Sequence, residues 1–324
     1  MPFKVLLPQD MDSSGKDLLI KNNIEIKMGT GIDEKILIRE IEDCDGVITR
    51  TAIITENVIK ASKKLKVIAK HGVGVDMIDA DFATKMGIKV VNAGDSNKLS
   101  VAEYTIGLII ALAKNYFIYD SELRKENFEI RNIKGMDLEG KTLGLIGFGK
   151  IGQLVAKKAS LGLGMKILVY KRKVGNKKVI DGIEFTEELN HVLKNADFLS
   201  LHIPYTKDTK KLIGKNEISL MKKEAFLINT ARGEVIDNDA LADALECRKI
   251  AGAAIDVFEN EIPTVDNKLF KLENVIVTPH AAAFSNEALQ RMSYEAAMGV
   301  VEVLNEDKVT YLCLLYTSPS PRDY

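Results

Sequence analysis

Short runs rich in apolar and β-branched residues alternate with segments of helical periodicity over the first third of the chain. The runs are FKVLLP (3–8), IEIKMG (24–29), DGVITR (45–50), KVIAKHG (66–72) and IKVVN (88–92), and their length and composition predict strands. Apolar residues recur at helical spacing in the intervening segments 13–23, 33–44, 56–65 and 79–87. Strands that alternate with helices predict a parallel, doubly wound sheet.

A second series of the same kind follows a long helical pattern. This pattern starts near Lys98, with Ser100 as the expected cap and Glu103 three residues later, and it predicts one helix that runs to Asn127. Strands are then expected at TLGLIG (142–147), KILVY (166–170), FLSLHI (198–203), AFLINT (225–230), GAAIDVF (252–258) and NVIVTP (274–279). A last amphipathic helix is expected at 285–305.

The two series predict two doubly wound α/β domains with a cleft between them. Residues 1–97 and 285–312 form the first predicted domain, because the last helix is placed to cross back onto it, and residues 98–284 form the second. The segment CLLYTSPSPRDY (313–324) is turn-rich and resembles the translation of a sequencing adapter, so we expect it to be an artefact. A native disordered tail is the alternative.

Composition and charge narrow the class of protein. The 324 residues include 45 Lys and Arg against 46 Asp and Glu, a balance that argues against a nucleic-acid partner. The most apolar stretch, 105–113, is shorter than the ~20 residues of a membrane helix. With no signal-peptide pattern, we expect a cytoplasmic protein without a membrane partner. The three cysteines have no paired spacing, which suits a reducing compartment and predicts no metal site.

The stretch GLIGFGKIG (144–152) places Gly147, Gly149 and Gly152 in the G-x-G-x-x-G pattern of dinucleotide-binding proteins. It follows a predicted strand and opens a predicted helix, which is the context that the pattern requires. Gly147 would permit the tight turn, Gly149 the approach of a pyrophosphate, and Gly152 close packing of helix on strand. A plain glycine-rich turn is the alternative.

The strand after this turn ends in cations where an acid is usual. Lys171 lies 171 − 152 = 19 residues past the last glycine, near the ~20 at which an acid would bind the ribose 2′-hydroxyl of NAD. A lysine there, followed by Arg172, would instead pair with a 2′-phosphate, so the sequence predicts a preference for NADP(H). The alternative is a solvated basic loop, since Lys173, Lys177 and Lys178 follow.

Three residues at predicted strand ends suit the reduction of a keto acid. Arg232 follows one strand, Glu261 lies in the loop after the next, and His280 follows the last. Arg232 would bind carboxylate and polarise the carbonyl, and His280 would exchange a proton with the substrate oxygen. Glu261 would orient the imidazole and favour its charged form. Taken singly, each residue has an ordinary surface or loop interpretation.

Three further strand ends suggest ligand contacts. His202 ends a strand of the second series and is expected to contact the cofactor, since ligands bind at the carboxyl ends of parallel strands. In the first series, the amides of Gly72, Val73 and Gly74 within KHGVGVD could hold a carboxylate. A simple turn is an equal alternative there. Arg50 lies at another strand end that faces the same predicted cleft.

These segments together resemble the D-isomer-specific 2-hydroxyacid dehydrogenase family. KHGVGVDMID, NKLSVAEYTIG, GLIGFGKIG, LHIPYTKDT, INTARGEVID, GAAIDVFENE and TPHAAA occur in the family's order over about all of residues 1–312. The resemblance implies a flavodoxin-like substrate domain and a Rossmann NAD(P)-binding domain. It implies hydride transfer to or from a small 2-keto or 2-hydroxy acid such as hydroxypyruvate or glyoxylate.

The resemblance also assigns residues. It implies Arg232, Glu261 and His280 as the catalytic trio, and Arg50 with the amides of 72–74 as the substrate site. Further cofactor contacts are implied at Lys150, Ile151, His202, Pro204, Thr230, Ala231, Asp256 and Ala282. A homodimer through the helix at 100–126 is implied as well. Two positions depart from the family's pattern: Lys171 replaces the usual acid, and Ile262 stands where a proline usually follows the glutamate.

Two other interpretations remain open at this point. The first is a D-3-phosphoglycerate dehydrogenase of serine biosynthesis, because Arg50 suits a phosphate as well as a carboxylate. The second, from another class, is a nucleotide-sensing corepressor-like binding protein.

Overall fold

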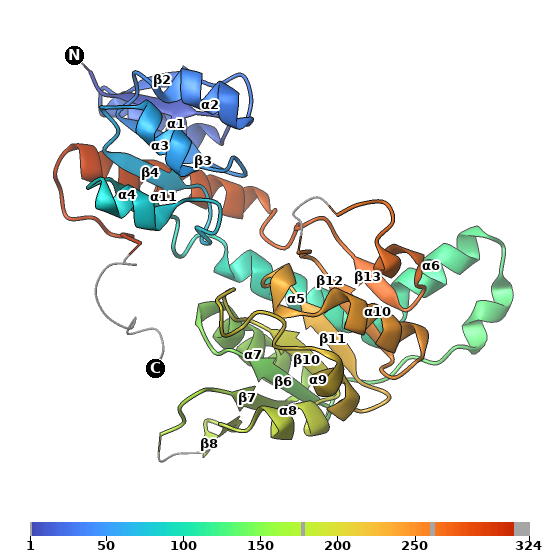
Figure 1. Ribbon diagram of the computed structural model, residues 1–324. Helices are drawn as coiled ribbons and strands as arrows, with labels where there is room; N and C mark the ends of the chain where they lie inside the picture. The colour runs from blue at the N-terminus through green and yellow to red at the C-terminus, as the bar shows by residue number, and fades with distance from the viewer. Residues whose placement is uncertain (1, 176–178, 260–262, 314–324) are drawn as a thin grey trace. The chain divides into compact units, whose positions relative to one another are not determined.

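The computed structural model describes residues 2–175, 179–259 and 263–313, and the chain divides into two compact units (Figure 1). Unit 1 comprises residues 1–97 and 284–324, and unit 2 comprises residues 98–283. Glu261, Ile262, Lys177, Lys178 and the segment 314–324 lie outside the described residues.

Unit 1 is a five-stranded parallel sheet in the order β2-β1-β3-β4-β5, the flavodoxin-like order. Its strands are the five that the sequence predicts: β1 (Lys4–Leu7), β2 (Glu25–Met28), β3 (Gly46–Thr49), β4 (Val67–Lys70) and β5 (Lys89–Asn92). Its helices are α1 (Ser13–Lys21), α2 (Glu34–Ile41), α3 (Glu56–Ala61), α4 (Ala80–Lys85) and α11 (Asn286–Leu304).

Two apolar clusters cover the two faces of this sheet. Residues of α2, α3 and α4 pack on one face, around Leu37, Ile41 and Val58. Residues of α1 and α11 pack on the other face, around Leu19 and Val300. The last helix therefore completes the core of the first unit, as the sequence predicts (Figure 1).

Unit 2 is an eight-stranded sheet in the order β13-β12-β11-β10-β6-β7-β9-β8. Its strands are β6 (Thr142–Ile146), β7 (Lys166–Tyr170), β8 (Val179–Ile180), β9 (Ile183–Thr186), β10 (Phe198–Leu201), β11 (Phe226–Asn229), β12 (Gly252–Ile255) and β13 (Val275–Val277). Its helices are α5 (Lys98–Ala113), α6 (Tyr116–Arg124), η1 (Phe128–Asn132), α7 (Lys150–Leu163), α8 (Leu189–Asn195), α9 (Lys215–Leu220), η2 (Gly233–Val235), α10 (Asn238–Glu246) and η3 (Lys268–Lys271). Helices α5 and α7 cover one face, and α8, α9 and α10 cover the other. This is a doubly wound sheet of the Rossmann type.

Two local predictions are wrong. The helix expected to run from a cap at Ser100 to Asn127 begins at Lys98 and ends at Ala113, so Ser100 lies inside it. Asn115 then adopts a left-handed φ of 54°, a conformation that asparagine tolerates, and the chain turns by 61° into α6. Strands β8 and β9 were not expected, and β8 is antiparallel to β9 because a short hairpin joins them.

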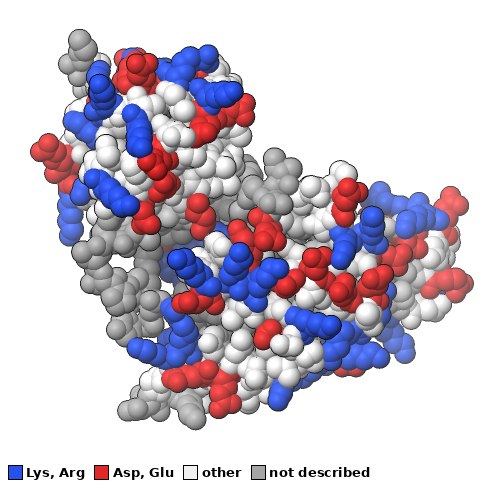
Figure 2. All heavy atoms as spheres, in the orientation of Figure 1, with Lys and Arg blue, Asp and Glu red and all other residues white. Residues whose placement is uncertain are grey.

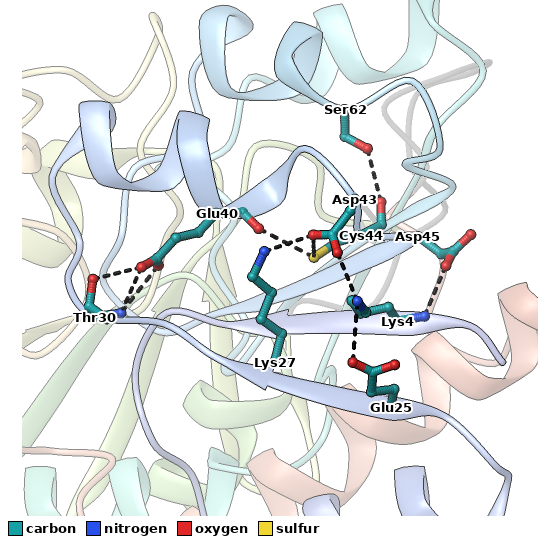
Figure 3. A network of polar contacts seen from close by, with 9 residues as sticks. All are labelled: Lys4, Glu25, Lys27, Thr30, Glu40, Asp43, Cys44, Asp45 and Ser62. Carbon is teal, nitrogen blue, oxygen red and sulfur yellow. Dashed lines mark hydrogen bonds and ion pairs between the residues drawn. The ribbon is translucent and has the colours of Figure 1, made fainter. Parts of the chain in front are cut away.

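A polar network ties together the elements of unit 1 near Asp43 (Figure 3). Asp43 accepts from the ammonium groups of Lys4 and Lys27, each at 2.7 Å, and these two contacts hold the pKa of its carboxyl well below the usual range. Burial raises the pKa of the neighbouring Cys44 thiol to about 12, so this cysteine is unreactive at neutral pH. The network lies near the start of β1, β2 and β3, and its contacts stabilise the fold of unit 1.

No single helix in the described part of the chain is long and apolar enough to cross a membrane; α5 and α6 reach that criterion only when taken together across their bend.

Candidate active site

The carboxyl ends of six strands of unit 2 carry the residues that the sequence singles out there. Since all six strands are parallel neighbours, their ends lie along one edge of the sheet. Across this edge, the sheet order places Lys171 after β7, the glycine turn after β6, His202 after β10, Arg232 after β11, Asp256 after β12 and His280 after β13. The order of the strands changes direction between β6 and β10, which is where doubly wound sheets bind their ligands.

The glycine turn after β6 has the backbone that a bound pyrophosphate requires. Gly147 has a φ of +97°, and a Cβ there would lie 2.4 Å from the carbonyl oxygen of His202. A Cβ on Gly152 would lie 2.6 Å from the carbonyl oxygen of Gly147, whereas a Cβ on Gly149 would meet nothing within 4 Å. The turn is therefore closed on the side of the protein and open at Gly149, next to the first amides of α7.

The Lys171 side chain is linked to this turn through the ring of Phe185. Its ammonium lies 5.8 Å from the ring centroid of Phe185 on β9, and Phe185 contacts Phe148 of the glycine turn edge to face, with centroids 5.1 Å apart. The backbone N–H of Lys171 also donates to the carbonyl of Thr186 at 3.0 Å. The unexpected strand β9 thus fixes the position of Lys171, and Arg172 beside it is exposed.

Asp256 holds the loop that carries His280. Its carboxylate, 0% exposed, accepts from the Thr278 hydroxyl at 2.6 Å and from the amides of Ala281 and Ala282 at 2.8 and 3.0 Å. The amide of His280 donates to the Asp256 carbonyl at 2.7 Å, and His280 itself has a left-handed φ of 54°. These bonds stabilise a backbone conformation that is uncommon for residues other than glycine. We predicted that Asp256 contacts the cofactor; in the structure both of its oxygens brace this loop.

Arg232 lies in a turn that Asn229 clamps. The Asn229 side chain accepts from the amide of Ala231 at 3.0 Å and donates to the carbonyl of Arg232 at 2.8 Å. Thr230, between them, shares a buried hydrogen bond of 3.0 Å with Thr105 of α5. Three residues after β11 are therefore fixed by side chains, and the half-buried guanidinium of Arg232 donates to the Ala231 carbonyl at 2.7 Å.

His202 is a neutral group in the fold. Burial lowers the pKa of its imidazole to about 4, and its Nε2 atom shares a hydrogen bond of 3.0 Å with the Ser200 hydroxyl. A histidine that stays neutral at physiological pH suits contact with a cofactor better than proton donation. Pro204, two residues later, is exposed.

In unit 1, the turn after β4 leaves two backbone amides available to bind a carboxylate, rather than the three that the sequence suggests. The Gly72 amide donates to the Lys70 carbonyl at 2.9 Å and is therefore occupied within the turn. The amides of Val73 and Gly74 donate to no other group in the part of the chain that the structure describes. Arg50, at the end of the neighbouring strand β3, donates to the Asp10 carbonyl at 2.9 Å.

His71, directly before this turn, belongs to a buried polar cluster. Its Nε2 atom lies 2.9 Å from the Ser293 hydroxyl on α11, which also accepts from the amide of Asp12 at 3.0 Å. Burial, and then the positive charge of Arg50, lower the pKa of His71 to about 4. A cavity of about 560 Å³ opens beside Arg50 and His71, and Asp10, Asp12, Glu287 and Gln290 also line it.

The lowered pKa of His71 predicts a loss of stability in weak acid. Its folded value of about 4 lies below the ordinary 6.5, so the unfolded chain takes up this proton first as the pH falls. The folded state should therefore lose about 3 kcal/mol between pH 6.5 and 4 through this one group. Urea unfolding measured across this range should show a flatter pH dependence in His71→Gln than in the wild type.

The exposed His191 provides the matched control, and His191→Gln should keep the wild-type dependence. Equal pH dependence in wild type and His71→Gln would refute the role of His71.

Sequence reasoning missed three residues that shape these sites. Asn229 and Phe185 contact the predicted site residues Arg232 and Lys171, and Ser293 contacts His71 just before the predicted turn, through side-chain contacts that no local pattern reveals. No cluster of three or more His, Cys, Asp or Glu side chains among the described residues could hold a metal ion. The glycine turn and the α7 amides fit a dinucleotide, as the space beside Gly149 indicates.

Comparison with known proteins supports one family throughout. Residues 106–282 match the family described as "D-isomer specific 2-hydroxyacid dehydrogenase, NAD binding domain". The chain is 43% identical to a D-3-phosphoglycerate dehydrogenase of Methanocaldococcus jannaschii over 86% of its own length and 53% of that protein. It is 38% identical to a hydroxypyruvate reductase of Thermotoga maritima over 90% of its length and 95% of that protein.

A solved structure extends the likeness to the fold. An NADPH-dependent glyoxylate/hydroxypyruvate reductase of Sinorhizobium meliloti, in complex with NADP and malonate, matches with a TM-score of 0.86 at 26% identity, over 97% of each chain. The chain spans about half the length of the phosphoglycerate dehydrogenases that it matches.

Proposed function

The chain belongs to the D-isomer-specific 2-hydroxyacid dehydrogenase family, and from this premise we propose that it transfers hydride between a nicotinamide cofactor, preferably NADP(H), and a small 2-keto or 2-hydroxy acid. One observation carries the proposal. A glycine turn that fits a dinucleotide shares one sheet edge with Arg232 and His280, whose loops are held by partly buried hydrogen bonds.

The chemistry divides between the cofactor and the chain. The bound nicotinamide supplies the hydride. Arg232 binds the keto acid and polarises its carbonyl, and His280 gives a proton to the carbonyl oxygen, so that one hydride and one proton complete the alcohol. From the sequence, we also propose that Glu261 orients the imidazole of His280 and favours its charged form. Glu261 lies outside the described residues. The other cofactor contacts that we propose are Lys150, Ile151, Thr230, Ala231 and Ala282.

The proposal is tested by following oxidation of NADPH and NADH in the presence of small 2-keto acids. We expect turnover with hydroxypyruvate or glyoxylate, the substrates after which two of the similar enzymes are named. A protein that binds the cofactor but turns over none of the acids would be a binding protein instead.

The second candidate for the function of the protein is D-3-phosphoglycerate dehydrogenase. The relatives that share this name include the one at 43% identity, and Arg50 at the end of β3 is a cation that suits a phosphate as well as a carboxylate. Activity with 3-phosphohydroxypyruvate well above that with hydroxypyruvate would favour this candidate.

The preference for NADPH is our prediction for the basic end of β7. Lys171 offers no acceptor to a ribose hydroxyl and attracts a 2′-phosphate, and its ammonium lies over the ring of Phe185, which packs against Phe148 of the glycine turn. We expect kcat/KM for NADPH to exceed that for NADH by roughly tenfold, a ratio that corresponds to ~1.4 kcal/mol. The ratio should fall with added salt, because exposed charges are screened.

Lys171→Asp should reverse the ratio, mainly through KM for the cofactor. Lys173→Asp removes the same charge from an exposed loop position two residues away, and it should change the ratio little. Equal values of kcat/KM in the wild type, or a preference for NADH, would show that the cluster is only a solvated loop.

We also propose that the protein is a cytoplasmic homodimer without nucleic-acid or membrane partners. Figure 2 shows acidic and basic side chains interspersed over the face in view, which fits the near-zero net charge. Most of the apolar side chains of α5 are buried, so we propose that the dimer interface includes the segment that follows α5. Exposed apolar side chains follow it on α6 and η1 and just beyond: Tyr116, Phe117, Leu123, Phe128 and Ile133.

Light scattering should therefore report a dimer at micromolar concentration. Phe128, 68% exposed, lies in this apolar surface, and Phe128→Glu should shift the mass toward the monomer. Val265→Glu, at an even more exposed apolar position elsewhere in unit 2, should leave the dimer intact. A monomeric wild type would contradict the prediction.

A further inference from the structure

Two hydrogen bonds from β5 and the residue after it fix the turn after β4 from behind. The Asn92 side chain donates from Nδ2 to the Val73 carbonyl at 2.8 Å. The amide of Ala93 donates to the Gly72 carbonyl, also at 2.8 Å. Neither bond belongs to the regular pairing of β4 with β5, which ends at the pair of Lys70 and Asn92.

These bonds set the direction of the two unoccupied amides. The described chain has no cis peptide bond, and in a planar trans peptide the N–H points away from the C=O of the same unit. Because the Val73 carbonyl points to Asn92, the Gly74 N–H points away from Asn92. By the same geometry, the Val73 N–H points away from Ala93. Two adjacent amides then face outward together, as in a backbone nest that binds an anion.

The sequence of the turn makes this support necessary. Glycine precedes and follows Val73, and Gly72 has a φ of +139°, so the local backbone has little intrinsic resistance to rotation of these peptides. The orientation of the amides must therefore come from contacts outside the turn. Ala93 supplies a backbone donor for one carbonyl, whereas the other depends on a single side chain.

We propose that Asn92 is a positioning residue, which aims the Gly74 amide at the substrate carboxylate by holding the Val73 carbonyl. The inference rests on the proposed function together with the substrate site that the family resemblance implies for the amides of this turn. Asn92 is 8% exposed and lies behind the turn, so it acts without contact to the substrate.

Asn92→Ala removes the bond to Val73 and leaves the Ala93 bond in place. The probe is oxalate, whose two carboxylates mimic a 2-keto acid, and its Kd is measured by calorimetry with cofactor-saturated protein. We expect Kd for oxalate and KM for the keto acid to rise about tenfold, the usual effect of losing one hydrogen bond to a charged group. We expect kcat to change less than threefold, and KM for the cofactor to stay the same.

Asn274→Ala is the matched control. Asn274 is 9% exposed and donates to the backbone carbonyls of Leu245 and Ala251 in unit 2, so its loss removes a similar buried bond elsewhere. The control should keep the oxalate Kd within about twofold of the wild-type value. Should Asn92→Ala fail to fold, Asn92→Asp keeps the shape of the side chain, loses the donor and should weaken oxalate at least as much.

An unchanged oxalate Kd in a folded Asn92 variant would overturn the proposal, as would a wild type that does not bind oxalate. A rise in KM for cofactor and keto acid alike would also overturn it, since that is the effect of a general loss of structure. Failure of the proposed function is a separate result: a wild type that binds oxalate but turns over no keto acid.

Discussion

Replacing His280 by asparagine is expected to lower kcat by about 10²–10⁴-fold, the usual contribution of a positioned acid–base group. His280 has a φ of 54°, and asparagine tolerates this left-handed conformation better than alanine does. The variant should therefore remove the imidazole and keep the loop. Its Kd for NADPH, measured by fluorescence titration, should stay close to the wild-type value.

The hydrogen bonds of the loop explain why the variant should lose turnover and still bind the cofactor. The bonds to Asp256 run from the Thr278 hydroxyl and from backbone amides of the loop, so these bonds do not depend on the His280 side chain. His191→Asn, at an exposed position on α8, is the matched control and should leave kcat unchanged. Near wild-type turnover by His280→Asn would exclude His280 as the proton donor.

Replacing Arg232 by lysine is expected to lower kcat/KM for the keto acid by about 10²–10³-fold, the usual cost of removing one donor to developing negative charge. Lysine keeps the positive charge and loses the planar pair of donors that matches a carboxylate and its neighbouring carbonyl. The backbone should hold, because the clamp from Asn229 uses the backbone of residues 231 and 232.

Arg248→Lys makes the same change at an exposed position of unit 2, and it should leave kcat/KM within about twofold. Thermal unfolding of both variants would show whether the loss is local. If Arg232→Lys retained the wild-type kcat/KM for every keto acid, the guanidinium would have no part in substrate binding.

The layout of both sheets was predictable because buried parallel strands read as short apolar runs. The break between α5 and α6 was not, since the apolar pattern continues through Asn115 and only its left-handed conformation interrupts the helix. Strand β9 carries a single fully buried residue, Phe185, so it shows no apolar run and depends on pairing with β7.

The residues of the candidate site were likewise partly predictable from the sequence and partly not. Gly147, Arg232 and His280 could be found from the sequence because they follow strands, and strand ends of a parallel sheet meet at one edge. What holds them in place could not, since Asp256 and Asn229 act through hydrogen bonds to loops whose shape no spacing encodes. The Gly72 amide is one example. The sequence pattern suggests that it donates to a ligand, whereas in the structure it donates to the carbonyl of Lys70.

The measurement that tests the central claim most directly is kcat/KM of the wild-type protein for hydroxypyruvate, glyoxylate and 3-phosphohydroxypyruvate, each with NADPH and with NADH. The account predicts turnover of at least one of these acids, with a roughly tenfold higher kcat/KM when NADPH is the cofactor. Binding of the cofactor without turnover of any of the three acids would contradict it.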